Sequence, residues 1–330
     1  MTSEPVRDRD QHVLKGARRL RFRNAEDSLA EVREGVYRWW WEFLRLSKDY
    51  WLVCQTSEPL RVGTRDPQLA RVYRRFGDIY SSSFDDWWIQ RGYRVFQERE
   101  RFPKVKELPR EPIERTRSKL LGDHIWVDIP LKLSRRTIQR QLGKILDAYE
   151  EQRPRNRLEL STSDFKLNPV QFRIHTLRQV HEIYSLHREL IAKPRALRAL
   201  SQHAGLEQRA DLFRIGKLLR VSPSNESLRG DPQEITRRQN RMRASVSRLL
   251  KRSELLIGNV EQGEFPSFKP ASIQQRARFT AAQLETHSEL ELQWWALDLT
   301  SSLSAGKLEQ AKKIHYDEEW KTRQGSNKQW

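Results

Sequence analysis

Residues 28–55 read SLAEVREGVYRWWWEFLRLSKDYWLVCQ, and this stretch decides the fold class. Its apolar residues recur in alternating steps of three and four, the spacing of one helix face: Leu29, Val32, Val36, Trp39, Phe43, Leu46, Tyr50 and Val53. Trp40 and Leu44 widen that face beyond a single stripe. The stretch therefore predicts one long helix that is buried on two sides.

Several later segments carry a capping residue in front of an amphipathic run. Ser83 and Asp86 have the spacing of a capping box, and Ser134 precedes a run that includes Ile138 and Leu142. Elsewhere a cap stands before a proline that suits the first helical position, at Asp66-Pro67, Asn168-Pro169 and Asp231-Pro232. Each of these signals predicts the start of a helix.

We expect a mainly α, multi-helix bundle with room for one short strand or hairpin near residues 124–130. In that segment Ile125-Trp126-Val127-Asp128-Ile129 alternates and contains β-branched residues. Changes in composition divide the chain into a flexible basic N-terminal arm (1–27), an aromatic-rich helical bundle (28–100), a proline-containing linker (101–123), a basic helical domain (124–300) and a polar tail (301–330).

The charge balance points to a polyanionic partner. The 330 residues include 62 Lys and Arg against 44 Asp and Glu, a formal net charge of +18. Nucleic acid is the expected partner, because each neutralised phosphate releases condensed counterions. An anionic membrane, an acidic protein, or a basic surface kept for solubility are the alternatives.

Other features of the composition bear on the compartment. Cys54 is the single cysteine, so no intrachain disulfide can form, which suits a reducing compartment. The sequence contains no secretory signal and no apolar run as long as a membrane span. We therefore expect a cytoplasmic protein without a membrane partner.

Residues 212–225, LFRIGKLLRVSPSN, resemble the helix-turn-helix pattern of many bacterial DNA-binding proteins. The apolar positions, the small residue where two helices cross and the cap of a recognition helix are supplied by Ile215, Gly216, Leu219, Val221 and Ser222. Two features depart from the pattern: Arg220 stands where glycine usually makes the turn, and Glu226 and Arg229 occupy aliphatic positions. An ordinary helix pair is the alternative.

The segment after this pattern predicts a long helix of a single charge sign. The segment from Ile235 to Arg252 contains no acidic residue. Its basic residues are Arg237, Arg238, Arg241, Arg243, Arg248, Lys251 and Arg252. At about 100° per residue, four of the arginines share much of one face: Arg237, Arg241, Arg248 and Arg252. Such a face suits phosphates, unless acidic residues from elsewhere in the fold neutralise it.

A second basic helix is expected between Lys132 and Lys144, with no acidic residue from Ile129 to Leu146. Ser134 and the helix N-terminus could together hold a phosphate, or the helix could face an acidic neighbour. Together the two helices and the turn give these nucleic-acid-binding candidates: Arg237, Arg238, Arg241, Arg243, Arg248, Lys251, Arg252, Ser222, Ser224, Asn225, Arg135, Arg136 and Arg140.

No catalytic motif is present, and we expect no catalytic residues, no cofactor and no metal site. His175, His181 and His187 are spaced so that each turns about 240° from the last on a helix, so they cannot converge on one metal. The helical spacing of the tryptophans predicts core packing rather than stacking on bases. Trp294 and Trp295 could instead anchor a protein subunit.

The sequence thus predicts a nucleic-acid-binding protein, with double-stranded DNA as the preferred ligand. It would serve as a regulator of transcription or as a subunit of a DNA-handling assembly. The alternative is a helical protein-interaction subunit without catalytic activity, whose aromatic surfaces would contact other subunits. A metal-dependent nuclease with carboxylates scattered along the chain is the third possibility.

Overall fold

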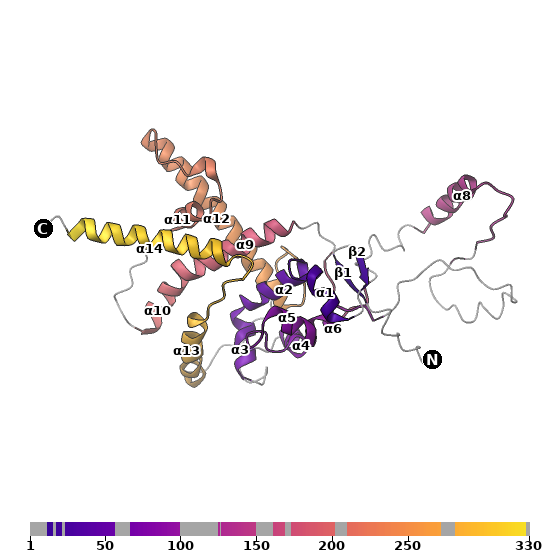
Figure 1. The fold of residues 1–330 in the computed structure, drawn as a ribbon, viewed down its shortest axis with the longest axis horizontal. Helices are drawn as coiled ribbons and strands as arrows, with labels where there is room; N and C mark the ends of the chain where they lie inside the picture. Colours follow the sequence, from indigo (N-terminus) through magenta and orange to yellow (C-terminus); the bar gives the residue numbers. More distant parts are fainter. Residues whose placement is uncertain are drawn as a thin grey trace.

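The computed structural model describes residues 12–15, 18–21, 24–56, 67–99, 125, 127–149, 161–168, 173–201, 210–271 and 281–327. These residues form a mainly α, multi-helix fold, as the sequence predicts (Figure 1). The linker expected at residues 101–123 lies outside the described residues.

The stretch that predicts one long helix forms three helices instead: α1 (Ala25–Val32), α2 (Val36–Arg45) and α3 (Lys48–Thr56). Gly35 occupies the N-cap position of α2, and its amide donates to the carbonyl of Val32. The Ser47 hydroxyl accepts a hydrogen bond from the amide of Tyr50, 2.9 Å away, at the start of α3. The apolar spacing continues through the two points where one helix ends and the next begins, so the sequence pattern does not indicate them.

The next helices are α4 (Pro67–Phe76), α5 (Phe84–Trp87) and α6 (Tyr93–Phe96), with a π-helical turn, Trp88–Gly92, before α6. The expected cap at Ser83 is confirmed, because its hydroxyl accepts from the amide of Asp86. Gly77, with φ +69°, follows the end of α4 in the left-handed region that favours glycine. Asp66, the expected cap of α4, lies outside the described residues.

A two-stranded antiparallel hairpin lies within the segment expected to be a flexible arm. It pairs β1 (His12–Lys15) with β2 (Arg18–Arg21), and Val13 is opposite Leu20. The prediction of a strand near 124–130 is wrong for the residues described there. Residues 125 and 127–130 have no regular secondary structure. Pro130 lacks an amide donor, and the described chain offers this segment no partner strand.

The remaining helices are α8 (Arg135–Asp147), α9 (Ile174–His187), α10 (Lys193–Ser201), α11 (Leu212–Leu218), α12 (Pro232–Glu261), α13 (Ala281–Ala296) and α14 (Ala305–Asn327). A π-helical turn, Arg188–Ala192, joins α9 to α10. The Ser134 cap is confirmed by its hydrogen bond from the amide of Thr137. The region expected to be a polar tail forms α14, because Leu308 and Ala311 are buried.

The six tryptophans of residues 28–100 pack in the core, as their spacing predicts. Trp39, Trp40, Trp41, Trp51, Trp87 and Trp88 are each at most 3% exposed. Their core extends past residue 100, since the Trp40 ring lies 6.1 Å from that of Phe165 and 5.6 Å from that of Phe265. The same cluster includes Leu256 and Val260 of α12.

A second, smaller core lies between α9, α11, α12 and α14. It contains Leu186, Ile215, Val246 and Leu308, all of them fully buried. Helix α12 therefore contributes to both cores, through Val246 to the second and through Leu256 and Val260 to the first. Its N-terminal part continues beyond this packing and projects from the body of the molecule (Figure 1).

Candidate nucleic-acid interface

Helix α12 begins where the sequence predicts. The Asp231 carboxylate accepts a hydrogen bond from the amide of Gln233, 3.0 Å away, and Pro232 takes the first helical position. The helix then runs for 30 residues to Glu261. A cap and a proline at this point satisfy or remove amide donors that would otherwise lack partners in the first turn.

The helix has one buried face and one basic face. Met242, Val246 and Leu256 are 0% exposed, and Val246 and Leu256 belong to the two cores. Five basic residues lie on the solvent side and are exposed: Arg237, Arg241, Arg248, Lys251 and Arg252. We call these five residues the α12 basic stripe; from Arg237 to Arg252 it is about 22 Å long at the helical rise per residue.

No carboxylate among the described residues pairs with any member of the stripe. The other two basic candidates of α12 are neutralised. Arg238 forms an ion pair with Glu234 and donates to the Arg229 carbonyl. Arg243 forms an ion pair with Asp211 at 2.8 Å. Acidic residues from elsewhere in the fold or the same helix therefore neutralise two of the seven basic candidates of α12. The other five, which form the stripe, carry only positive charge.

Two members of the stripe lie back along the helix instead of extending fully into solvent. The Arg248 guanidinium donates to the carbonyl of Ala244 at 3.3 Å and lies 3.4 Å from the Ser245 hydroxyl. The Arg252 guanidinium carbon is 5.5 Å from the ring centroid of Phe268. These contacts hold two charges close to the helix surface, where a ligand that lies along α12 would meet them.

The helix-turn-helix expectation is wrong in its second half. Helix α11 ends at Leu218, and Arg220 adopts the left-handed region with φ 53°. The Ser222 side chain makes no capping hydrogen bond, and a single 3-10 turn, Pro223–Asn225, stands where the recognition helix should begin. Within this turn the Asn225 side-chain amide donates to the Ser222 hydroxyl at 2.7 Å, and Ser224 is exposed.

The cause lies in the residues after the turn. Glu226, Ser227 and Arg229 offer no apolar face that could pack against α11, so the chain stays irregular until Asp231. The expected close approach at Gly216 does occur, but with α12 as the partner. A Cβ at Gly216 would lie 2.5 Å from the sulfur of Met242. The segment is therefore a helix pair joined by a longer connection.

The basic residues of α8 are not brought together with the stripe. Arg135, Arg136 and Arg140 are exposed, and no residue of α8 is buried. In Figure 1 α8 lies well away from α11 and α12. The candidate interface thus consists of the α12 basic stripe alone.

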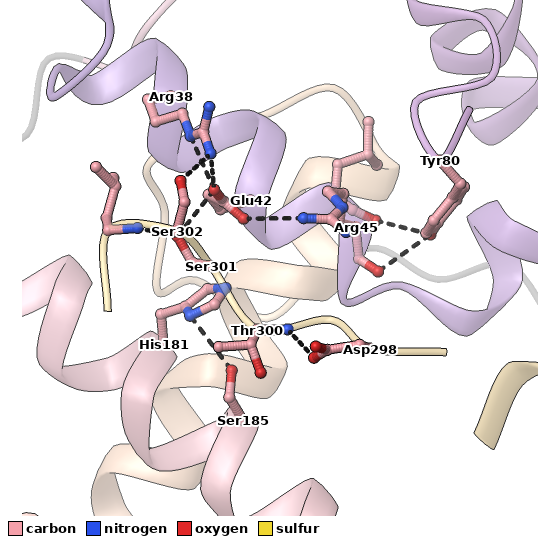
Figure 2. Close-up of polar contacts among 12 residues, drawn as sticks. Arg38, Glu42, Arg45, Tyr80, His181, Ser185, Asp298, Thr300, Ser301 and Ser302 are labelled. Carbon is pink, nitrogen blue, oxygen red and sulfur yellow. Dashed lines mark hydrogen bonds and ion pairs between the residues drawn. The ribbon is translucent and has the colours of Figure 1, made fainter. Parts of the chain in front are cut away.

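The sequence analysis missed a buried charge cluster near the start of the chain. Glu42 on α2 is 0% exposed, and its carboxylate accepts from Arg38 Nε at 2.8 Å and from the Ser301 hydroxyl at 2.9 Å. Arg45 Nη1 lies 3.6 Å from the same carboxylate (Figure 2). A glutamate within the run Trp-Glu-Phe, with arginines four residues before and three after it, was the signal available in the sequence.

Over the part of the chain that the structure describes, no group of three or more His, Cys, Asp or Glu side chains is placed to hold a metal ion. Over the same part, none of the helices has both the length and the apolar character needed to cross a bilayer. No protein-family model matches this chain, and neither a curated protein nor a solved structure matches it.

Proposed function

We propose that the protein binds nucleic acid, with double-stranded DNA preferred, through the α12 basic stripe. The observation that carries the proposal is the single charge sign of this exposed face. A helix surface normally gains from mixed charges, since opposite charges four residues apart stabilise it and like charges destabilise it. A polyphosphate ligand reverses that penalty.

The preference for duplex DNA follows from the shape of the interface. Helix α12 is long and carries its charges along one side. A helix with side chains is about 10–12 Å across and fits the B-DNA major groove, which is about 12 Å wide. The major groove of duplex RNA is too deep and narrow to admit it. We therefore expect duplex DNA to bind more tightly than duplex RNA or a single strand.

The test is a set of binding curves for fluorescent duplex DNA over a series of salt concentrations. If all five cations of the stripe contact phosphates, log K should fall against log[salt] with a slope of about −4 to −5. Replacing Arg237, Arg241, Arg248 and Arg252 together by alanine should flatten that slope by about 3 to 4. Circular dichroism would show whether the helical content is kept.

The matched control removes the same number of charges from α8, by replacing Arg135, Arg136, Arg140 and Lys144 with alanine. These residues are also exposed, so the net charge falls equally. The control should keep most of the parent slope. If the slope of log K against log[salt] flattens equally in both variants, the net charge of the protein, and not the stripe, drives binding. If the parent protein does not bind duplex DNA at low salt, the proposal is wrong, and the hypothesis of a protein-interaction subunit takes its place.

A further inference from the structure

A pocket of about 440 Å³ opens between α2, the start of α5 and the turn that precedes α14. Its lining residues include Arg33, Arg38 and Arg45, together with Trp41 and Phe84. It contains no residue of α12, so it is separate from the proposed nucleic-acid interface.

Two carboxylates form ion pairs with the three arginines of this pocket. Arg33 is paired with Asp85, whose Oδ2 lies 2.8 Å from Arg33 Nη2. Arg38 and Arg45 share one carboxylate, that of Glu42, at 2.6 Å and 3.6 Å respectively. Three guanidinium groups thus share two ion-paired carboxylates. A third carboxylate, that of Asp298, interacts electrostatically with Arg45 and with Lys312, and both cations favour its charged form.

Arg45 is the least satisfied of the three. Its contact with Glu42 is an ion pair too long for a hydrogen bond, and its guanidinium donates no hydrogen bond to any residue in the described ranges. Its Nε is buried without a partner, although the side chain as a whole is 18% exposed and lines the pocket. Because Nε is buried, a ligand in the pocket would meet the terminal Nη groups of Arg45, which donate no hydrogen bond to any described residue. An oxyanion would supply acceptors for these groups.

The aromatic wall holds two of these arginines in place. The guanidinium carbons of Arg38 and Arg45 each lie 4.8 Å from the ring centroid of Trp41, and that of Arg38 lies 4.6 Å from Phe84. Arg38 also donates to the hydroxyl of Ser302, another pocket residue, at 3.1 Å (Figure 2). Because the charged groups are already oriented, a ligand would not have to order them.

We infer that this pocket binds the phosphate group of a small organic phosphate, with Arg45 as the main donor and Arg38 beside it. Guanidinium groups match the geometry of phosphate oxygens. The pocket has room for more than a phosphate, and Trp41 and Phe84 offer an apolar surface to the organic part. The inference does not depend on nucleic-acid binding by α12.

The test is calorimetric titration of the full chain with inorganic phosphate, ribose 5-phosphate and adenosine monophosphate, at constant ionic strength in chloride buffer. We expect at least one of the three to bind, and the organic phosphates to bind more tightly than inorganic phosphate. Arg45→Gln should weaken the binding by about tenfold or more, the effect of losing a charge-assisted contact. Arg74→Gln, at an exposed arginine of α4 outside the pocket, should leave it unchanged.

A second variant acts in the opposite direction and does not remove a buried group. Asp85→Asn removes the half-exposed carboxylate that neutralises Arg33, so it should tighten phosphate binding several-fold. The inference is overturned if none of the three phosphates binds, if binding survives Arg45→Gln, or if Asp85→Asn fails to tighten it.

Discussion

Arg243 donates two hydrogen bonds, of 3.1 and 2.8 Å, to one carboxylate oxygen of Asp211. The other oxygen of that carboxylate accepts from the amide of Arg214 and thereby caps α11. One aspartate thus joins the start of α11 to the middle of α12. This ion pair also makes Arg243 different from Arg241, two positions away on α12. Arg241 has no carboxylate partner in the described part of the chain.

This difference predicts unequal effects of two similar substitutions. Arg241→Gln should flatten the salt dependence of DNA binding by about 0.9 in log–log slope, the value for one phosphate contact. Arg243→Gln should change the slope less, because Asp211 already balances its charge. Fluorescence anisotropy over a salt series measures both slopes. Equal effects would mean that ligand binding breaks the pair with Asp211.

Gly216 predicts a packing effect on the same helix pair. A Cβ at this position would lie 2.5 Å from Met242 Sδ and 3.0 Å from Val246 Cγ2. Gly216→Ala should therefore lower the free energy of unfolding by about 1–3 kcal/mol, despite the better helix propensity of alanine. Gly306→Ala is the control, since nothing lies within 4 Å of its added Cβ. Urea denaturation of both variants would test this, and a stabilised Gly216→Ala variant would contradict the packing shown here.

Local signals in the sequence predicted local structure well. The caps at Ser83, Ser134 and Asp231 each accept a hydrogen bond from an amide two or three residues ahead, so the residues that form each contact are close in the sequence. The burial of the tryptophans followed from their helical spacing in the same way. Periodicity failed at Gly35 and Ser47, where the apolar pattern runs on although the helix stops.

Contacts between distant residues were the part that sequence could not supply. Asp211 is 32 residues from Arg243, and Ser301 is 259 residues from Glu42. The helix-turn-helix pattern matched the residue types up to Val221. The length of the connection after it depends on whether Glu226 and Arg229 can pack against α11, and these charged side chains cannot. The exposure of the stripe was predictable from its spacing, whereas its lack of carboxylate partners required the fold.

Two tryptophans offer a matched test of a buried hydrogen bond. Trp88 and Trp40 are both 0% exposed. Trp88 Nε1 donates to the Ser28 hydroxyl at 2.7 Å, whereas Trp40 Nε1 has no hydrogen-bond partner among the residues that the structure describes. Replacing either by phenylalanine removes a similar volume. Trp88→Phe should therefore cost about 1–2 kcal/mol more than Trp40→Phe, the value of one buried hydrogen bond. Equal losses in chemical denaturation would show that the Ser28 contact contributes nothing.

The Glu42 carboxylate should be important for stability. Glu42→Gln keeps the shape of the side chain but leaves Arg38 and Arg45, which are only 10% and 18% exposed, without their shared counter-charge. Breaking such a pair from one side should lower the free energy of unfolding by about 3 kcal/mol. Asp85→Asn, which breaks the exposed pair with Arg33, should cost less than about 1 kcal/mol. Similar midpoints for the two variants in urea would contradict this ranking.

His181 predicts how stability depends on pH. Burial against the rings of Trp39 and Phe43, each 5.5 Å away between centroids, lowers the pKa of His181 from 6.5 to about 4. Between these values the unfolded chain takes up a proton that the folded chain does not, so the free energy of unfolding should fall as the pH is lowered. By pH 4 the loss from this one group should reach about 3 kcal/mol.

The test compares pH profiles, because carboxylates also titrate in this range. His181→Gln should remove the part of the decline that begins near pH 6.5, whatever its effect on stability at neutral pH. His175→Gln is the control: it changes an exposed histidine of the same helix and should keep the parent profile. Urea denaturation at intervals from pH 7.5 to 5 supplies both profiles. If the parent and His181→Gln lose stability in parallel, the folded protein must accommodate a charged His181, and the buried environment described here would not hold in solution.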